Sequence, residues 1–301
     1  MIETHEFSDR NWGACLSANN DQVELNIPFE FGPSILRCQF KDEENCFAEF
    51  PAHKTDPDSG KWHSFGGHRL WHGPEDIVRT YLPDNDPVQV EILDSTILIQ
   101  QKIEPRTQLQ KEMEIRLAGS GAQVQITHRI RNHNLFELRM ALWAISVMAT
   151  QGRAIIPLPA RGTHDGNLQA QTSLNLWAYT DLQDSRWQIG KKYISFRQDP
   201  AISDPQKIGI SSSGGWLAYI NAGHTFLKKC AYIDQEEYPD QGSAFEVYAD
   251  HKCVEMESLG PLTTIEPGGF ATLVEDWILI KGIVRNSNEN ELDQHLACAF
   301  I

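Results

Sequence analysis

Short segments in which apolar and polar residues alternate recur from one end of this 301-residue chain to the other. A period of two places every second side chain on the same face of an extended strand, so each segment predicts a strand with one buried face. Strands are expected at 22–27, 88–91, 96–101, 112–117, 123–130, 193–197, 216–220, 226–233, 244–248, 252–259 and 271–279. Turn-forming clusters separate them at 56–60, 83–86, 211–215, 238–242 and 266–269. Many short strands joined by turns predict an all-β sandwich or barrel.

Helical periodicity is weak, which leaves room for only a few short helices. Residues 290–299 predict one terminal helix, and Pro74 predicts a helical turn over 73–80. Segment 138–148 is apolar on both faces, which is typical of a central strand covered on both sides. Because no Pro-, Gly- or Ser-rich linker separates two compositions, residues 1–301 are expected to form a single domain.

The charge balance argues against two classes of partner. With 41 acidic and 26 basic residues, the formal net charge is −15. Such a surface repels phosphate backbones and anionic lipids, so neither nucleic acid nor a membrane is an expected partner. The N-terminus shows no basic stretch followed by an apolar run, and no segment approaches the ~18 apolar residues of a membrane helix. Six cysteines scattered without a CxxC pair predict reduced thiols, and together these features predict a cytoplasmic protein.

Two groups of motifs carry a resemblance to a known superfamily. The first reads Phe-Gly-Gly-His-Arg-Leu-Trp-His-Gly-Pro-Glu at 65–75, followed by Tyr-Leu-Pro-Asp-Asn at 81–85. The second reads Val-Glu-Met-Glu-Ser-Leu-Gly-Pro-Leu at 254–262, followed by Ile-Glu-Pro-Gly at 265–268 and Glu-Asp-Trp at 275–277. These motifs resemble a group of domains of unknown function within the galactose mutarotase-like (aldose 1-epimerase-like) superfamily. The resemblance covers nearly the whole chain and implies a large antiparallel supersandwich that binds a sugar or oligosaccharide.

The resemblance also implies roles for individual residues. Aldose 1-epimerases carry an early sugar-binding arginine, a histidine acid in the middle of the chain, and a late glutamate base at the anomeric hydroxyl. Arg69 stands at the place of the arginine and Glu257 at the place of the glutamate. Where the histidine would lie, the chain reads Trp-Ala-Ile-Ser-Val-Met at 143–148. An epimerase of this kind therefore needs another acid, for which the candidates are His68, His72 and a protonated Glu255.

The late motif supports carboxylate chemistry independently of the resemblance. Glu255 and Glu257 fall on one face of the expected strand 252–259, together with Cys253 and Leu259. Two carboxylates that share a cleft raise the pKa of one another, which yields one neutral acid and one ionised base. A solvated edge position is an equally weighted alternative for Glu255, since carboxylates are mostly exposed.

The early motif gathers groups that suit sugar recognition in a glycine-containing loop. An arginine fork donates paired hydrogen bonds to hydroxyls, and indole faces stack on the C–H faces of a sugar ring. A structural ion pair with Glu75 or Asp76 is the alternative for Arg69. The expected substrate-binding residues are Arg69, Trp71, His72, Glu75, Glu255 and Trp187, with Lys207, Lys228 and Tyr238 as weaker candidates for the rim of the site.

The histidines of the early motif raise the question of a metal site. His68 and His72 form an HxxxH pair that chelates zinc when it lies on a helix, with Glu75 as a further ligand. Gly66, Gly67 and Pro74 argue against a helix there, and no calcium loop, phosphate-binding loop or dinucleotide motif occurs. We therefore expect neither a metal nor a cofactor.

Three functions remain open on these grounds. The first is a sugar epimerase with Glu257 as general base. The second is a carbohydrate-binding protein without catalysis; the missing histidine favours this function and the third one over strict mutarotation. The third is a polysaccharide lyase or glycoside hydrolase that pairs Glu257 with Glu255 or Glu246.

Overall fold

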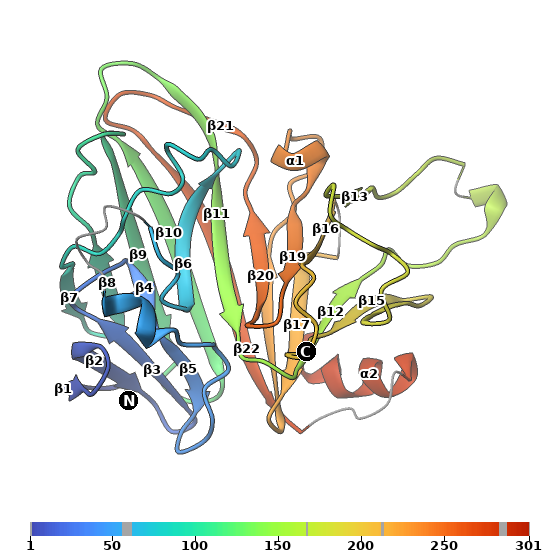
Figure 1. Ribbon diagram of the computed structural model, residues 1–301, viewed down its shortest axis with the longest axis horizontal. Coiled ribbons are helices and arrows are strands. Elements are labelled where there is room, and N and C mark those ends of the chain that lie inside the picture. The colour runs from blue at the N-terminus through green and yellow to red at the C-terminus, as the bar shows by residue number, and fades with distance from the viewer. Residues whose placement is uncertain (1, 56–61, 167, 212–213, 283–287, 301) are drawn as a thin grey trace.

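The computed structural model describes residues 2–55, 62–166, 168–211, 214–282 and 288–300. Two large antiparallel sheets lie face to face and enclose most of the buried apolar side chains (Figure 1). This arrangement confirms the predicted all-β antiparallel sandwich. Among the described residues, no helix combines the length and the apolar character needed to cross a membrane.

The larger sheet has ten strands, each paired antiparallel to its neighbours. Their order is β14 (Trp187–Ile189), β15 (Tyr193–Arg197), β12 (Arg153–Pro157), β17 (Trp216–Asn221), β18 (His224–Cys230), β22 (Phe270–Lys281), β10 (Gln123–Asn132), β9 (Leu109–Leu117), β8 (Thr96–Gln100) and β7 (Gln89–Leu93).

The second sheet has eight strands. Seven of them lie side by side in one series, and the eighth, β21, pairs with β11. Their order is β13 (Leu174–Leu176), β16 (Gln206–Ile210), β19 (Phe245–Ala249), β20 (Val254–Leu259), β11 (Leu138–Met148), β6 (Gly67–Gly73) and β4 (Ser34–Ile35), with β21 (Thr263–Ile265) beside β11.

A small third sheet and a few helical turns complete the described fold. The sheet runs β1 (Glu3–Asp9), β2 (Gly13–Asn19), β3 (Val23–Pro28) and β5 (Arg37–Phe40). The helical elements are η1 (Pro51–Thr55), η2 (His164–Gly166), α1 (Pro239–Gly242), α2 (Glu289–Leu296) and η3 (Ala297–Phe300).

The alternation seen in the sequence corresponds to the two faces of these strands. In β22, Leu273, Trp277 and Leu279 are buried between the sheets, whereas Thr272 and Val274 face solvent. Burying one face of each sheet against the other provides the apolar stabilisation of the fold, at about 25 cal/mol for each Å² of apolar surface.

Several predicted elements are confirmed at the residue level. β11 spans Leu138–Met148 and is buried on both faces near the middle of its sheet. The predicted terminal helix is α2 followed by η3, and the Asn288 side chain caps it by accepting a hydrogen bond from the Asn290 N–H. All six cysteines are free. The turn cluster at 56–60 and residues 212–213 of another lie outside the described residues.

The segment 67–73 differs from the prediction, because it is strand β6 and not a loop. Gly66 and Gly67 have φ values of 86° and 67°, in the left-handed region that disfavours a side chain. A Cβ on Gly67 would lie 2.4 Å from the Ile35 carbonyl oxygen, and one on Gly66 would lie 2.0 Å from that of Ala48. The glycines therefore allow the chain to pass close to β4 and enter the sheet. The helical turn expected over 73–80 amounts to one hydrogen bond, from Thr80 N–H to the Asp76 carbonyl.

Candidate functional site

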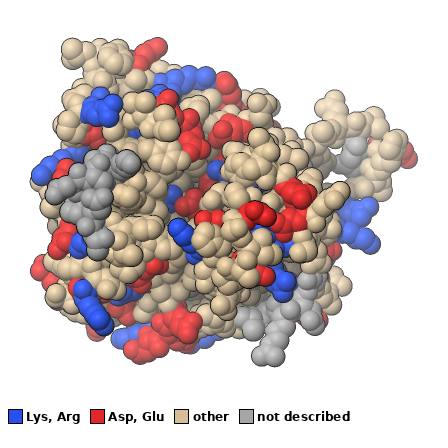
Figure 2. All heavy atoms as spheres, in the orientation of Figure 1, with Lys and Arg blue, Asp and Glu red and all other residues tan. Residues whose placement is uncertain are grey.

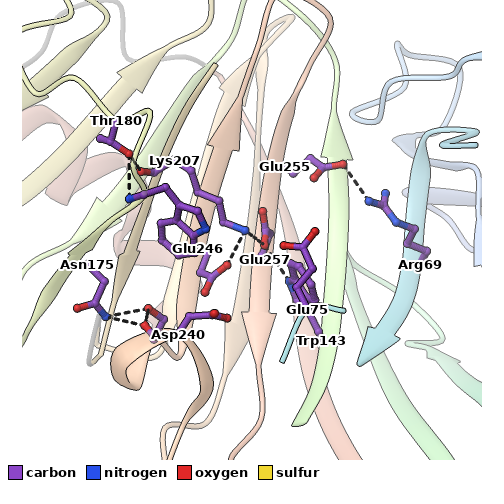
Figure 3. A network of polar contacts seen from close by, with 12 residues as sticks. Arg69, Glu75, Trp143, Asn175, Thr180, Lys207, Asp240, Glu246, Glu255 and Glu257 are labelled. Atoms are coloured by element: carbon purple, nitrogen blue, oxygen red, sulfur yellow. Dashed lines mark hydrogen bonds and ion pairs between the residues drawn. The ribbon is translucent and has the colours of Figure 1, made fainter. Parts of the chain in front are cut away.

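The face of the eight-stranded sheet that points away from the ten-stranded sheet carries Arg69 from the first sequence motif and Glu255 and Glu257 from the second. In the pairing register, Ile145 of β11 lies opposite Arg69 of β6 on one side and Glu257 of β20 on the other. Glu257 in turn lies opposite Glu246 of β19. Residues paired across adjacent strands share a face, so these side chains form one row, although Arg69 and Glu246 at its ends are 177 positions apart in the chain. Figure 3 shows several of them converging.

A cleft of about 350 Å³ opens on this face. Aromatic side chains form much of its wall: Phe50, Trp62, Trp71, Tyr81, Trp143, Tyr179 and Tyr248. The charged or titratable residues around it are His53, Arg69, Glu75, Lys207, Asp250, Lys252 and Glu255. On the face drawn in Figure 2, acidic side chains gather around the middle of the molecule and basic ones lie among them. Aromatic faces with a few convergent polar groups are the usual makeup of a small-molecule site.

Arg69 and Glu255 form an ion pair on the cleft wall, with 3.0 Å between Nη2 and Oε1. The guanidinium lies over the rings of Trp62 and Trp71, at 5.0 and 4.6 Å from their centroids. Its Nε and Nη1 atoms make no hydrogen bond within the described part of the chain. Arg69 therefore pairs with Glu255 and not with Glu75 or Asp76, and Glu255 is held at the cleft by a charge-assisted contact.

Lys207 ties two buried carboxylates together beneath the cleft (Figure 3). Its Nζ lies 2.7 Å from Glu246 Oε2 and 3.0 Å from Glu257 Oε2. Trp143 Nε1 donates to the same Glu257 oxygen at 2.8 Å. The ammonium also lies over the rings of Trp143 and Trp177, at 4.9 and 4.7 Å. The cluster of Lys207, Glu246, Glu257 and Trp143 thus links an aromatic wall of the cleft to the floor beneath it.

Burial and neighbouring charges both shift the pKa values of this cluster. Burial raises the pKa of Glu246 well above its ordinary value, and the neighbouring Glu257 adds to this rise although Lys207 opposes it. Burial also raises the pKa of Glu257, with a further contribution from Glu255. For Lys207, burial alone would lower the pKa, but the two carboxylates outweigh that effect and the pKa is raised.

Three of the residues predicted for the site lie elsewhere. His68 and His72 occupy the other face of β6 and point into the core between the sheets, because their positions differ by one from those of Arg69 and Trp71. Trp187 belongs to the ten-stranded sheet, where it packs on Phe196. The sequence predicts a loop for this segment. In a strand, by contrast, alternate residues face opposite sides, so His68 and His72 face away from Arg69.

The rim candidates divide in the same way. Lys207 lines the cleft. Lys228 is fully buried between the sheets, and Tyr238 stacks on Tyr232. Glu257, expected as the base, lies on the predicted face of β20 but is fully buried and does not line the cleft.

The position of His72 has a measurable consequence for stability. Burial lowers its pKa to about 4, from an ordinary value near 6.5. Below pH 6.5 the unfolded chain binds a proton at this residue that the folded chain does not bind until about pH 4, so stability falls as the pH falls through this window. In His72→Phe, the loss of unfolding free energy between pH 7 and pH 5 should be smaller than in the wild type by about 2 kcal/mol. Urea denaturation at the two pH values measures this difference, and equal losses in the two proteins would contradict it.

His53 was not identified from the sequence, although it lines the cleft. Its Nδ1 lies 2.7 Å from the Ser64 carbonyl oxygen, which can only accept a hydrogen bond, so Nδ1 carries the proton of the neutral ring. Nε2 is then the ring nitrogen left to accept a hydrogen bond. His53 lies on η1, about 200 residues before Glu255. This segment has no recognisable periodicity, so no sequence pattern predicts that His53 faces the cleft.

A second hollow, of about 1150 Å³, lies between α2 and the strands β14 and β15. Its lining includes Arg161, Lys191, Lys192 and Glu289. Its lining also includes Gly214 and Asn288, which directly follow in sequence the segments 212–213 and 283–287 that lie outside the described part of the chain. We therefore place the candidate site in the smaller cleft, where the carboxylates, the arginine and the aromatic wall converge.

No protein-family model and no curated protein sequence matches the chain. Solved structures do. A galactose mutarotase-like protein from Lactobacillus casei superposes with a TM-score of 0.55 at 10% identity, covering 88% of this chain and 99% of that one. A candidate aldose 1-epimerase from Klebsiella pneumoniae superposes with a TM-score of 0.58 at 10% identity, covering 99% and 87%. A galactose mutarotase-like protein from Clostridium acetobutylicum gives 0.50 at 11% identity, covering 93% and 99%.

Proposed function

We propose that this chain, which has the galactose mutarotase-like fold, binds a carbohydrate in the cleft between Arg69, Glu255 and the aromatic wall. The observation that carries the proposal is the ion pair of Arg69 with Glu255, set against the indoles of Trp62 and Trp71. Sugars present hydroxyls at their edges and C–H groups on their faces. A site with a charged donor–acceptor pair beside flat aromatic surfaces meets both needs.

The charge around the cleft favours a neutral sugar. Arg69 and Lys252 are balanced by Glu75, Asp250 and Glu255, while Lys207 is neutralised by the carboxylates beneath it. Among the described residues, the cleft has no surplus of positive charge to bind a sugar phosphate or a uronate. Neutral hydroxyls, by contrast, can insert between Arg69 and Glu255 without leaving either charge unpaired.

For the chemistry, we propose that Glu255 is the general base of an aldose 1-epimerase-like reaction. A base must come within about 3 Å of the proton that it takes. Glu255 lines the cleft with 19% of its side chain exposed, whereas Glu257 is fully buried and already accepts from Lys207 and Trp143. Glu257 then serves as a positioning residue that holds the cleft wall.

His53 is the proposed acid in this mechanism. The reaction needs a donor that protonates the ring oxygen while the base removes the proton of the anomeric hydroxyl and the bond from C1 to the ring oxygen breaks. His53 lines the same cleft as Glu255, whereas His68 and His72 face the core. In the doubly protonated imidazolium, Nε2 can therefore deliver its proton to the ring oxygen, while the Nδ1–H stays hydrogen-bonded to the Ser64 carbonyl and the ring returns to its neutral form.

The same cleft supports binding without catalysis as the second candidate. Glu255 already accepts a hydrogen bond from Arg69, and this charge-assisted pair can hold sugar hydroxyls without any proton transfer. A lyase or hydrolase would need two exposed carboxylates. Glu75, which lines the cleft and accepts a hydrogen bond from Tyr81, would be the partner of Glu255.

Isothermal titration with neutral aldoses, galactose and glucose first, tests the binding proposal. Arg69→Met should weaken binding about tenfold to a hundredfold, because it removes a charge-assisted hydrogen bond. Arg139→Met, a half-exposed arginine paired with Glu237 outside the cleft, is the matched control and should bind like the wild type. Equal sugar affinities of the wild type and Arg69→Met would contradict the proposal that the sugar binds in this cleft.

A further inference from the structure

A second polar cluster lies between the two sheets, on the opposite side of β6 from the cleft. It consists of His68 on β6, His128 on β10 and Glu275 on β22, all with no exposed surface. Both sheets contribute to it, and apolar core surrounds it. Neither sugar binding nor proton transfer in the cleft uses these residues. Burying these polar groups costs free energy, so other interactions must compensate for their loss of hydration.

The three ligand atoms of this cluster point at one another. His68 Nε2 lies 3.3 Å from His128 Nε2, and Glu275 Oε2 lies 3.8 Å and 3.7 Å from these two nitrogens. In the plane of the three atoms, the point equidistant from them is about 2.1 Å from each, which matches zinc–imidazole and zinc–carboxylate bond lengths. Two histidines and one glutamate are also the protein ligands of known zinc sites, in which a water or substrate takes the fourth position.

The surroundings hold these ligands in place. Ser146 Oγ lies 2.9 Å from His68 Nδ1, and a hydrogen bond there orients the ring with Nε2 toward the cluster. Trp277 Nε1 donates to Glu275 Oε2 at 2.9 Å. Metal ligands are commonly oriented by such outer hydrogen bonds. His128 Nδ1 has no hydrogen-bond partner among the described residues.

We propose that His68, His128 and Glu275 bind one Zn²⁺ ion that joins the two sheets. Because the ligands are fully buried, the ion enters as the chain folds, and its binding energy stabilises the folded state. Lys228 contacts the other oxygen of the same carboxylate, at 2.8 Å. This like charge weakens the site without occupying a ligand position. Without an ion, the same atoms form only a hydrogen-bonded network in which Lys228 balances Glu275.

Elemental analysis of the wild type distinguishes the ion from the network. Protein produced without a metal-chelating tag in zinc-supplemented medium should contain about one zinc per chain after dialysis against EDTA. Refolding from urea with Zn²⁺ should restore the ion, and refolding with EDTA should give a protein with a lower melting temperature. Less than about a tenth of an equivalent after both procedures would overturn the proposal.

Variants locate the ion. His128→Phe should lose the zinc, whereas His72→Phe should keep it, since His72 is an equally buried histidine on the same face of β6. Lys228→Met removes the competing cation and should keep at least as much zinc as the wild type. Loss of zinc from His72→Phe or Lys228→Met to the same extent as from His128→Phe would place the ion elsewhere. Should His128→Phe fail to fold, visible absorption of wild-type protein refolded with Co²⁺ reports the ligands directly, and the absence of these bands would contradict the proposed site.

Discussion

Replacing Glu255 by glutamine is expected to slow anomer interconversion by about a hundredfold to ten-thousandfold, the usual cost of removing a general base. Glutamine keeps the shape of the side chain and a carbonyl oxygen for Arg69, but it cannot take a proton. Sugar affinity should therefore change much less than the rate. Polarimetry on freshly dissolved α-glucose and α-galactose, with the wild type and the variant side by side, measures the effect.

Glu257→Gln separates this mechanism from the one implied by the sequence resemblance. If Glu257 were the base, its glutamine variant would lose the rate and Glu255→Gln would keep it. Glu91→Gln, an exposed position on β7 in the other sheet, is the control for nonspecific effects. His53→Gln should slow the reaction as well, since it removes the proposed acid. A wild type that binds a sugar yet accelerates no common aldose would leave the non-catalytic binding protein as the function.

Lys207→Met is expected to lower the free energy of unfolding by about 3–5 kcal/mol at neutral pH, the typical effect of removing one partner from a buried ion pair. Methionine fills a similar volume but leaves Glu246 and Glu257 without their shared cation. Both carboxyls already have a raised pKa, and losing Lys207 raises it further. Since ionising a buried carboxylate is costly, the deficit should grow as the pH rises from 5 to 8. Urea denaturation at several pH values tests the magnitude and the sign.

Two further variants check the cause of this loss. Adding Glu257→Gln to Lys207→Met should recover part of the stability, because the buried site then holds one ionisable carboxyl fewer. Lys102→Met, an exposed lysine, should stay within about 0.5 kcal/mol of the wild type. A pH-independent deficit in Lys207→Met would point to lost packing against Trp143 and Trp177 in place of lost charge.

The fold could be predicted largely from local patterns. The period-two alternation in segments such as 123–130 and 271–279 predicts strands β10 and β22, because the polar and apolar sides of a strand face different environments. The same rule correctly placed Glu255 and Glu257 on one face of β20. The motif order pointed to the mutarotase-like fold that the solved structures share.

The site depended on pairing and packing that no local pattern contains. Whether Arg69 or His68 faces the cleft is decided by which face of β6 covers the core, and a shift of one residue exchanges the two. His53 and Lys207 reach the cleft from segments outside both motifs. His68, His128 and Glu275 come together only because two sheets stack. The sequence by itself determined the strands and their alternation, which are local properties; the tertiary structure decided which residues meet, because sheet register and stacking join residues far apart in the chain.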